Sequence, residues 1–356
     1  MKHPESPEPS PTSKAPLRLV IVNDSATVRA ALRHAFAGVP DMTVVGDARD
    51  GAHALEVVTA QRPSVVLMDI LMPVMDGYAA TRRIMATIPT PIVLVSGSMN
   101  PRDSGVAMEA LRSGALAIVE LLPPTSDPAY AVRRAALLHL VRSMAQVKLH
   151  ALTARVGTRP TRPPTAIEGD VAVIGIVAST GGPNAVLELL RMLPPRVMPP
   201  LLIVQHIARG FATGYARWIA DATGHPTSVA VDQAPARRGE VYIAADERYL
   251  GLDASMHLVV SDEPQVGLFR PSGNYLFNSL ARSMGRRARG VVLTGMGDDG
   301  ADGAVALRRS GGRVAAQDEA TSVIYGMPRA AVERGGADIV LPLLDIPAWL
   351  CGQSAV

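Results

Sequence analysis

Short apolar runs alternate with amphipathic stretches along most of the chain. In the front half this pattern predicts strands at 17–22, 43–45, 64–68, 91–95 and 117–120, and helices at 25–37, 52–61, 77–87, 103–113 and 128–150. Strands such as VVLM and IVLV hold no polar residue, which is typical of strands that are covered on both faces. The front half is therefore predicted to be of the α/β class, with an open, doubly wound parallel sheet.

A second alternating series begins at Val171. It predicts strands at 171–177, 200–204, 229–231, 241–244, 257–260, 291–293, 313–316 and 338–341, and helices at 184–192, 208–223, 275–287, 300–310 and 327–334. The alternation again indicates strands joined by helices, and the longer series predicts a second, larger α/β domain.

Two polar segments frame these domains. Residues 1–16 are rich in proline and serine and lack the apolar run of a signal peptide, so a disordered tail is predicted. Residues 151–170 mix proline, threonine, arginine and glycine without periodicity, which is typical of a linker. The domains are therefore expected at 17–150 and 171–352.

Composition argues against several classes of protein. No apolar run reaches the about 18 residues of a membrane-spanning helix, so we expect no membrane insertion. Cys351 is the single cysteine, which rules out an internal disulfide and fits a cytoplasmic location. The net charge is +3 and only 4% of the residues are aromatic, so the arginines at 282–289 are interpreted as a solvated helix face and no nucleic-acid binding is expected.

Polar side chains follow several predicted strands of the front domain. Asn23 and Asp24 follow the first strand, Asp69 follows VVLM, and Ser96 ends the segment IVLVS. The carboxyl ends of parallel strands line one crevice, where two carboxylates and a hydroxyl suit a hard cation such as Mg²⁺. A carboxylate in such a site can accept a phosphoryl group. The alternative is that Asp24 and Asp69 only cap the helices that follow them.

The motifs of the front domain resemble those of response-regulator receiver domains. LVIVNDSATVRAAL, VVLMDILMPVMDG, IVLVSG and SGALAIVE occur in that order within residues 17–122. The resemblance implies a flavodoxin-like fold, with Asp69 as the phospho-acceptor and with Asp24 and Asp69 as Mg²⁺ ligands. Asn23 stands where the family usually has an acid, and Leu121 stands where it usually has a lysine. We therefore expect weaker metal binding and a weakened or altered phosphorylation response.

Three strand ends of the rear domain carry groups that suit nucleophilic catalysis. Ser179 precedes two glycines and a helix, His206 ends the run LLIVQH, and Asp298 and Asp299 lie in the turn of VVLTGMGDDGADG. Such groups form a possible triad of nucleophile, base and orienting acid. Each alone has a simpler interpretation, namely a phosphate-binding turn or helix cap, a satisfied histidine and a solvated acidic turn.

Residues 171–345 resemble the catalytic domain of the chemotaxis protein-glutamate methylesterases. The motifs ASTGGP, IVQH, RRGEVYIAADERYLGL, FRPSGNYLFNSLA, GVVLTGMGDDGADG and AAQDEATSVIYGMPRAA follow one another in that order. The resemblance implies a Rossmann-like, three-layer fold in which Ser179 is the nucleophile, His206 the general base and Asp299 the orienting acid.

The same resemblance assigns two supporting residues. The backbone N–H of Met296 falls at the position that binds the oxyanion, and Thr180 lies beside the nucleophile and is expected to shape the site. Val177 replaces a glycine that is common in the family, and Tyr249 stands where histidine is frequent. Neither difference falls on the expected triad.

The implied enzyme is a serine carboxylic ester hydrolase without a cofactor for the esterase reaction. It would demethylate glutamyl methyl esters on methyl-accepting chemoreceptors and deamidate glutamines there. The receiver would block the active site until a chemotaxis histidine kinase phosphorylates Asp69, with Mg²⁺ bound in the receiver. The protein is expected to be a monomer in a two-component signalling pathway.

Three other functions are compatible with parts of this sequence. The chain could be a receptor-binding adaptor with a weakly active site and a degenerate receiver. A nucleotide-binding protein would use ASTGG to hold a phosphate, but the sequence lacks a Walker lysine and a G-x-G-x-x-G motif. A metal hydrolase is least favoured, because no paired histidines have ligand spacing.

Overall fold

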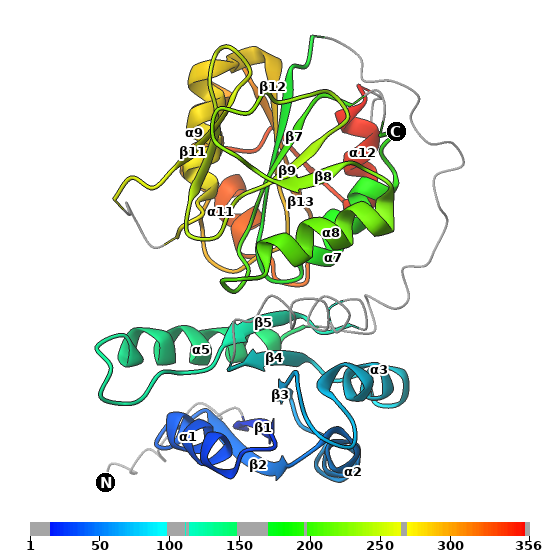
Figure 1. Ribbon diagram of the computed structural model, residues 1–356, viewed down its shortest axis with the longest axis vertical. Coiled ribbons are helices and arrows are strands. Elements are labelled where there is room, and N and C mark those ends of the chain that lie inside the picture. The colour runs from blue at the N-terminus through cyan, green and yellow to red at the C-terminus, as the bar shows by residue number, and fades with distance from the viewer. Residues whose placement is uncertain are drawn as a thin grey trace, which may run out of the picture.

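The computed structural model describes residues 15–97, 111, 114–147, 170–195, 198–264 and 269–352. Two α/β domains stack along the long axis of the molecule, with the N-terminal domain at the bottom of Figure 1. Most of the tail 1–16, the linker 151–170 and the predicted helix 103–113 lies outside the described residues. Within the described ranges, no helix combines the length and the hydropathy that a bilayer crossing requires.

The N-terminal domain is built on a five-stranded parallel sheet. Its strands are β1 (Leu17–Val22), β2 (Met42–Ala48), β3 (Val65–Asp69), β4 (Ile92–Ser96) and β5 (Ala117–Glu120). Its described helices are α1 (Ala26–Phe36), α2 (Gly51–Gln61), α3 (Gly77–Thr87) and α5 (Tyr130–Met144). The strand order β2-β1-β3-β4-β5 is that of flavodoxin-like sheets, whose ligands bind beyond the ends of β1 and β3.

The C-terminal domain has a seven-stranded parallel sheet and a separate antiparallel hairpin. The sheet consists of β6 (Val173–Ala178), β7 (Leu201–Gln205), β8 (Thr227–Val229), β9 (Val241–Ile243), β12 (Ala288–Val292), β13 (Arg313–Gln317) and β14 (Ile339–Leu341). The hairpin pairs β10 (Tyr249–Leu252) with β11 (Leu258–Ser261). The helices are α7 (Gly182–Arg191), α8 (Ala212–Thr223), α9 (Gly273–Ser283), α10 (Ala301–Arg309), α11 (Met327–Glu333) and α12 (Ile346–Leu350).

The strand order β14-β13-β12-β6-β7-β9-β8 makes this sheet doubly wound. From β6 the chain moves outward through β7, and it later returns to β12 on the other side of β6. In sheets of this kind the ligand crevice lies where the direction reverses, beyond the carboxyl ends of the strands. We therefore expect the ligand crevice of this domain at the loops that follow β6, β7 and β12.

Side chains of β6 alternate between two apolar layers, and this makes the domain three-layered. Ile174 and Ile176 belong to the core on the side of α7, α8 and α12, whereas Val173 and Val177 pack with α9 and α10. Gly175 stands under α9, where a Cβ would lie 2.7 Å from a methyl group of Leu280. The helix can approach the sheet this closely because position 175 has no side chain.

The element boundaries differ from the sequence predictions at a few places. Helix α8 begins at Ala212 rather than 208, because Gly210 has a φ of 86° and ends the preceding turn outside the helical region. The predicted helix 275–287 ends at Ser283, and Gly285, at φ 49°, begins a short 3₁₀ turn. Strand β10 and helix α12 were not predicted, since each is five residues or shorter.

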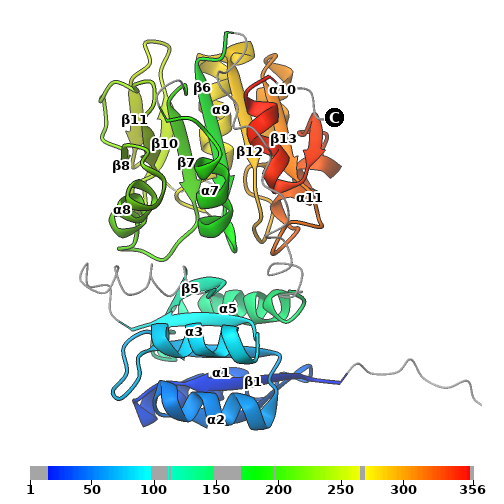
Figure 2. The ribbon, with the colours of Figure 1, turned by 90° about the vertical axis from the view of Figure 1, so that its right-hand side faces the viewer.

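Strand β5 and helix α5 of the N-terminal domain face the C-terminal domain (Figures 1 and 2). The Gly181 N–H donates to the carbonyl oxygen of Leu116 at 3.2 Å, and the Asn184 side chain donates to the carbonyl oxygen of Leu111 at 3.1 Å. Both donors lie in the first turn of α7 or just before it. The N-terminal domain therefore docks at the strand ends where the sheet reverses direction.

Candidate active site

Three neighbouring strands bring the predicted triad residues to one edge of the sheet. Ala178 of β6 is paired with Gln205 of β7, and Val177 is paired with Val292 of β12. Ser179 and His206 therefore leave adjacent strands at the same level, and the loop after β12 begins beside them. Residues far apart in sequence thus meet because of the strand order.

The backbone of Ser179 is held from both neighbouring strands. Its N–H donates to the Thr294 carbonyl at 3.1 Å, and its carbonyl accepts from the Gln205 side chain at 2.8 Å and from the Gly182 N–H at 2.8 Å. Gly181, at φ 76°, turns the chain sharply from β6 into α7. The serine side chain is consequently presented at a fixed position at the start of a helix.

The carboxylate of Asp299 is the most fully satisfied group of the site. One oxygen accepts from the Ser272 hydroxyl at 2.8 Å and from the Asn274 N–H at 3.1 Å. The other oxygen accepts from the Gly273 N–H at 2.6 Å and lies 2.9 Å from Nε2 of His206. The donors Gly273 and Asn274 form the first turn of α9, where a helix stabilises negative charge.

These contacts decide the charge of Asp299. Burial on its own would raise the pKa of this carboxyl group, because the charged form is desolvated. The hydrogen bond and charge of His206, together with the amides of Gly273 and Asn274, outweigh burial and hold the pKa of Asp299 below its ordinary value. Asp299 is therefore an anion at neutral pH and accepts the His206 Nε2–H.

The orientation of His206 leaves its other ring nitrogen available. The Nδ1 atom is buried and, among the described residues, has no hydrogen-bond partner. Because Nε2 carries the proton that binds Asp299, the neutral ring has its lone pair at Nδ1. His206 lines a cavity of about 230 Å³ together with Ser179 and Thr180. Nδ1 is thus the atom that can act as a base toward the serine.

Four residues that support this arrangement were not predicted from the sequence. Phe269 stacks on the His206 ring with centroids 4.6 Å apart and an interplanar angle of 6°. Ser272, Gly273 and Asn274 surround Asp299. The motif FRPSGNYLFNSLA contained a signal, because a Ser-Gly pair before an apolar periodic stretch indicates a helix N-terminus, which favours an anion.

The two adjacent aspartates of the GDDG turn have different surroundings. Asp298 is exposed and forms an ion pair with Arg334, which also binds Asp302 at 2.8 Å. Asp299 is buried and turned toward His206. The geometry therefore assigns the histidine-orienting position to the second aspartate alone.

Met296 and Thr180 are the two supporting residues that the resemblance predicted. Thr180 is buried, and its carbonyl accepts from the Thr294 hydroxyl at 2.9 Å. Met296 follows Gly295, where a Cβ would stand 2.7 Å from the Cβ of Ser179. The chain at position 295 thus passes directly against the serine, and Met296 is the next residue.

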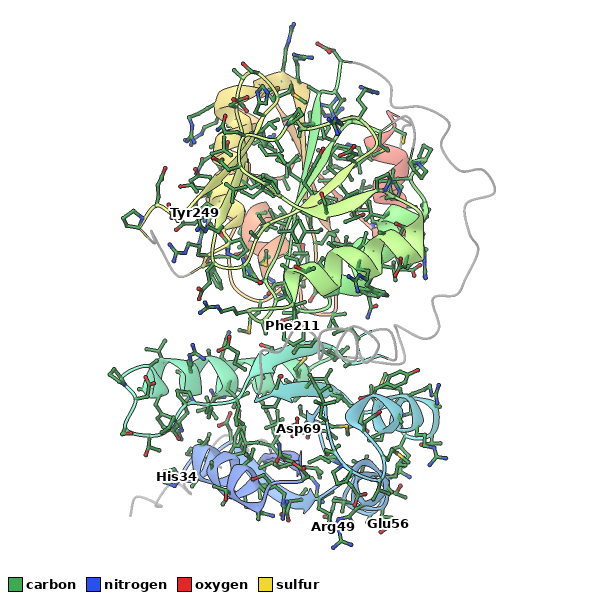
Figure 3. The ribbon with its side chains drawn as sticks, viewed as in Figure 1. His34, Arg49, Glu56, Asp69, Phe211 and Tyr249 are labelled. Carbon is green, nitrogen blue, oxygen red and sulfur yellow. The ribbon has the colours of Figure 1, made fainter. Side chains whose placement is uncertain are left out.

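The N-terminal domain holds the second group of predicted residues. The Asn23 side-chain amide donates to Asp69 at 2.6 Å, while its oxygen accepts from the Ser25 N–H at 2.8 Å. Burial, and to a lesser extent the nearby charge of Asp24, raises the pKa of the Asp69 carboxyl group to about 6. Asp69, labelled in Figure 3, belongs to β3 and is separated from the C-terminal domain by β4 and β5.

The expected metal site has a reduced set of ligands. Asp24 and Asp69 supply two carboxylates, which fit Mg²⁺ because this ion commonly binds through one or two carboxylates and keeps several waters. Asn23 presents an N–H group to Asp69 instead of an oxygen to a cation. Among the described residues there is no group of three or more histidine, cysteine or acidic side chains suited to a metal.

The usual lysine of the receiver site has no replacement nearby in sequence. Leu121 packs in the apolar cluster beside β4 and β5, and its methyl group would lie 3.7 Å from a Cβ added at Gly97. Residues 15–147 contain no lysine. The position expected to carry a cation therefore carries an apolar side chain.

Comparisons with known proteins agree with these observations. A model of the CheB methylesterase family matches residues 174–350, and a model of the response regulator receiver domain matches residues 19–120. A protein-glutamate methylesterase/protein-glutamine glutaminase of Myxococcus xanthus is 43% identical over 344 residues, which cover 94% of this chain and 96% of that protein.

The chain belongs to the CheB methylesterase family. A protein of the same name from Anaeromyxobacter dehalogenans is 43% identical over 91% of this chain and 95% of its own length. The crystal structure of the Thermotoga maritima CheB methylesterase catalytic domain is 32% identical and matches with a TM-score of 0.50, covering 51% of this chain and 98% of that domain. The two α/β domains are thus a receiver domain and a methylesterase catalytic domain.

The receiver domain covers the active site in this structure. The cavity that contains Ser179, Thr180 and His206 is closed on its other side by β5 and by Leu140 of α5. A second contact joins the Ser143 hydroxyl to the sulfur of Met296 at 3.5 Å. The receiver domain thus forms part of the wall around the half-buried Ser179.

Proposed function

We propose that this protein is a protein-glutamate methylesterase and protein-glutamine glutaminase that acts on methyl-accepting chemoreceptors. The observation that carries the proposal is the hydrogen bond between the ionised Asp299 and His206, a residue that lines the cavity of Ser179 and whose Nδ1 has no other partner in the described part of the chain. This arrangement contains a nucleophile, a base and an orienting acid in the roles of a serine hydrolase.

The first half of the reaction forms an acyl-enzyme. The Ser179 hydroxyl oxygen attacks the ester carbonyl of a glutamyl side chain, and His206 accepts the serine proton at Nδ1. The oxyanion of the tetrahedral intermediate accepts a hydrogen bond from the backbone N–H of Met296, and Thr180 shapes the wall beside it. The intermediate collapses with cleavage of the C–O bond, and His206 returns the proton to the departing methoxide, which leaves as methanol.

The second half regenerates the enzyme. Water gives a proton to His206 and attacks the acyl carbonyl, and the intermediate collapses to a free glutamate and the Ser179 hydroxyl. A glutamine side chain follows the same path with ammonia as the leaving group. Asp299 remains ionised throughout and stabilises the imidazolium ring. The reaction needs no cofactor.

Control of the reaction is proposed to come from the receiver domain. A chemotaxis histidine kinase would supply the phosphoryl group to Asp69, which weakens the docking of β5 and α5 over the active site. The covered cavity and the contact of Ser143 with Met296 support this regulation. Asp24 and Asp69 would hold Mg²⁺, which neutralises charge around the incoming phosphate, once the Asn23 amide turns away from Asp69.

We further propose that the enzyme acts in the cytoplasm as a monomer that recognises receptor proteins and not nucleic acid. The family of the chain and the lack of a spanning helix among the described residues support a soluble partner of membrane receptors. The phosphate would arrive from a kinase of the same signalling pathway.

The test is methanol release from methylated receptor membranes, with receptor binding measured in parallel. We expect release by the full-length protein, stimulation by acetyl phosphate with Mg²⁺, and loss of release in Ser179→Ala with receptor binding retained. Binding without release by the unaltered protein would support the adaptor function. Release that persists in Ser179→Ala would exclude the serine mechanism.

A further inference from the structure

A cavity of about 430 Å³ lies beside the active site, between the catalytic and receiver domains. Gln205, which holds the Ser179 carbonyl, and Met296 form part of its wall. The cavity also contains three arginine side chains, Arg133, Arg209 and Arg270. The mechanism proposed above uses none of these cations.

The three arginines differ in how their charges are neutralised. Arg133 forms an ion pair with Glu120, and Arg209 lies 3.3 Å from Glu247. Arg270 has no ion pair among the described residues. Its Nη1 donates to the backbone carbonyl of Glu263 at 3.1 Å, and its buried Nε lacks a partner within the same part of the chain.

One further acid, Asp246, lines the same cavity. Asp246 accepts from the Gly210 N–H at 3.0 Å, and burial raises the pKa of its carboxyl group. It forms no ion pair with Arg270 in the described residues. The guanidinium group of Arg270 therefore keeps hydrogen-bonding capacity for an acceptor from outside the chain.

The residues on either side of Arg270 contact the catalytic residues. The preceding residue, Phe269, stacks on the His206 ring, and Ser272 binds Asp299 through its hydroxyl. Arg270 thus lies in a segment anchored to the catalytic base on one side and to the orienting acid on the other. Such an anchored cation suits recognition of substrate beside the ester.

We propose that Arg270 binds a carboxylate of the receptor substrate, carried by a residue close to the ester-bearing glutamate. A guanidinium group pairs with a carboxylate through two parallel hydrogen bonds, whereas the ester itself is neutral. On a helical substrate, an acidic residue three or four positions away projects from the same face. Arg270 would then determine specificity, and this inference rests on the proposed methylesterase function.

The experiment compares two substrates within each enzyme variant. Receptor membranes carry a single methylated site and either glutamate or glutamine at the neighbouring position on the same helix face. Methanol release by the full-length protein with acetyl phosphate and Mg²⁺ gives kcat/KM for each substrate. The ratio of the two values is independent of the fraction of enzyme that is folded, so a poorly folding variant remains informative.

The unaltered enzyme is expected to prefer the glutamate substrate by about 10- to 100-fold, mainly through KM. Arg270→Gln should reduce the ratio to about one, and Arg270→Lys should keep part of the preference because it retains the charge but not the paired donors. Arg209→Gln is the matched control, since Arg209 lines the same cavity but is already paired with Glu247. Its ratio should match that of the unaltered enzyme.

Two results would overturn the inference. The first is equal rates of the unaltered enzyme on both substrates, and the second is an unchanged preference in Arg270→Gln. A purely structural role would lower both rates of Arg270→Gln together and leave the ratio intact. Absence of methanol release by the unaltered enzyme from either substrate would instead contradict the proposed function itself.

Discussion

His206 and Asp299 meet through Nε2 of the ring, at 2.9 Å, which leaves Nδ1 without a hydrogen-bond partner among the described residues. In the serine-protease arrangement the two nitrogens have the opposite roles. The chemistry is the same, because either nitrogen of a neutral imidazole can act as the base when the other donates to a carboxylate. The identity of the basic nitrogen is therefore set by Asp299.

Replacing Asp299 should test this control of the tautomer. In Asp299→Asn the side chain can donate a hydrogen bond to Nε2, which shifts the proton to Nδ1 and removes the base. We expect kcat to fall by about 10³- to 10⁴-fold. Asp298→Asn is the control, because Asp298 pairs with Arg334 and does not contact His206, and it should change kcat less than about threefold. Comparable losses in both variants would contradict the assignment.

The pH dependence of stability provides a separate test of Asp299. Because its folded-state pKa is below its ordinary value, the ionised form stabilises the fold above about pH 4, and this contribution is lost as the pH falls through the folded-state pKa. The difference in unfolding free energy between the unaltered protein and Asp299→Asn should be constant near neutrality and shrink in acid. Urea unfolding at several pH values measures it, and a difference that grows in acid would count against the lowered pKa.

Loosening the receiver contact should raise activity without a phosphodonor. In Ser143→Arg a long charged side chain replaces the hydroxyl that touches Met296, so docking is weakened. A loss of about 1.4 kcal/mol would raise basal methanol release by up to tenfold. Val132→Arg lies on the same helix but is 72% exposed, so it should leave the rate unchanged. Equal basal rates in Ser143→Arg and the unaltered protein would argue against this contact as a restraint.

Introducing an acid at position 23 of the receiver domain should strengthen Mg²⁺ binding. In Asn23→Asp a carboxylate replaces the amide that now donates to Asp69, so the site gains negative charge and an oxygen ligand. We expect Mg²⁺ to bind roughly tenfold more tightly, since ligand charge sets the affinity of such sites. Isothermal titration calorimetry measures the change, with Asp24→Asn as the opposite control. An unchanged dissociation constant would mean that the ion does not bind at this pair of acids.

Much of the fold could be predicted because each buried strand is a continuous apolar run. VVLM, IVLV and LLIVQ mark β3, β4 and β7 closely, since a parallel sheet covered on both faces requires apolar residues at every position. Strand β11 was predicted at 257–260, but its partner β10 escaped prediction because it has only four residues and lies between polar turns. Short strands of this kind acquire their structure from tertiary pairing.

The site was predictable as a set of residue types but not as an arrangement. Strand ends identified Ser179, His206 and the acidic turn, yet nothing local told which acid turns inward. That choice depends on Arg334, which draws Asp298 outward, and on the first turn of α9, which surrounds Asp299. The contact of Phe269 with His206 likewise depends on packing between distant segments.

The central claim is that one acyl-enzyme on Ser179 serves both the ester and the amide reaction. Hydroxylamine competes with water for such an intermediate and converts part of the product to a glutamyl hydroxamate. The account predicts the same ratio of hydroxamate to glutamate from a methylated receptor and from its glutamine form, with no hydroxamate above background in Ser179→Ala. Different ratios from the two substrates, or hydroxamate formation that survives in Ser179→Ala, would contradict a shared intermediate on this serine.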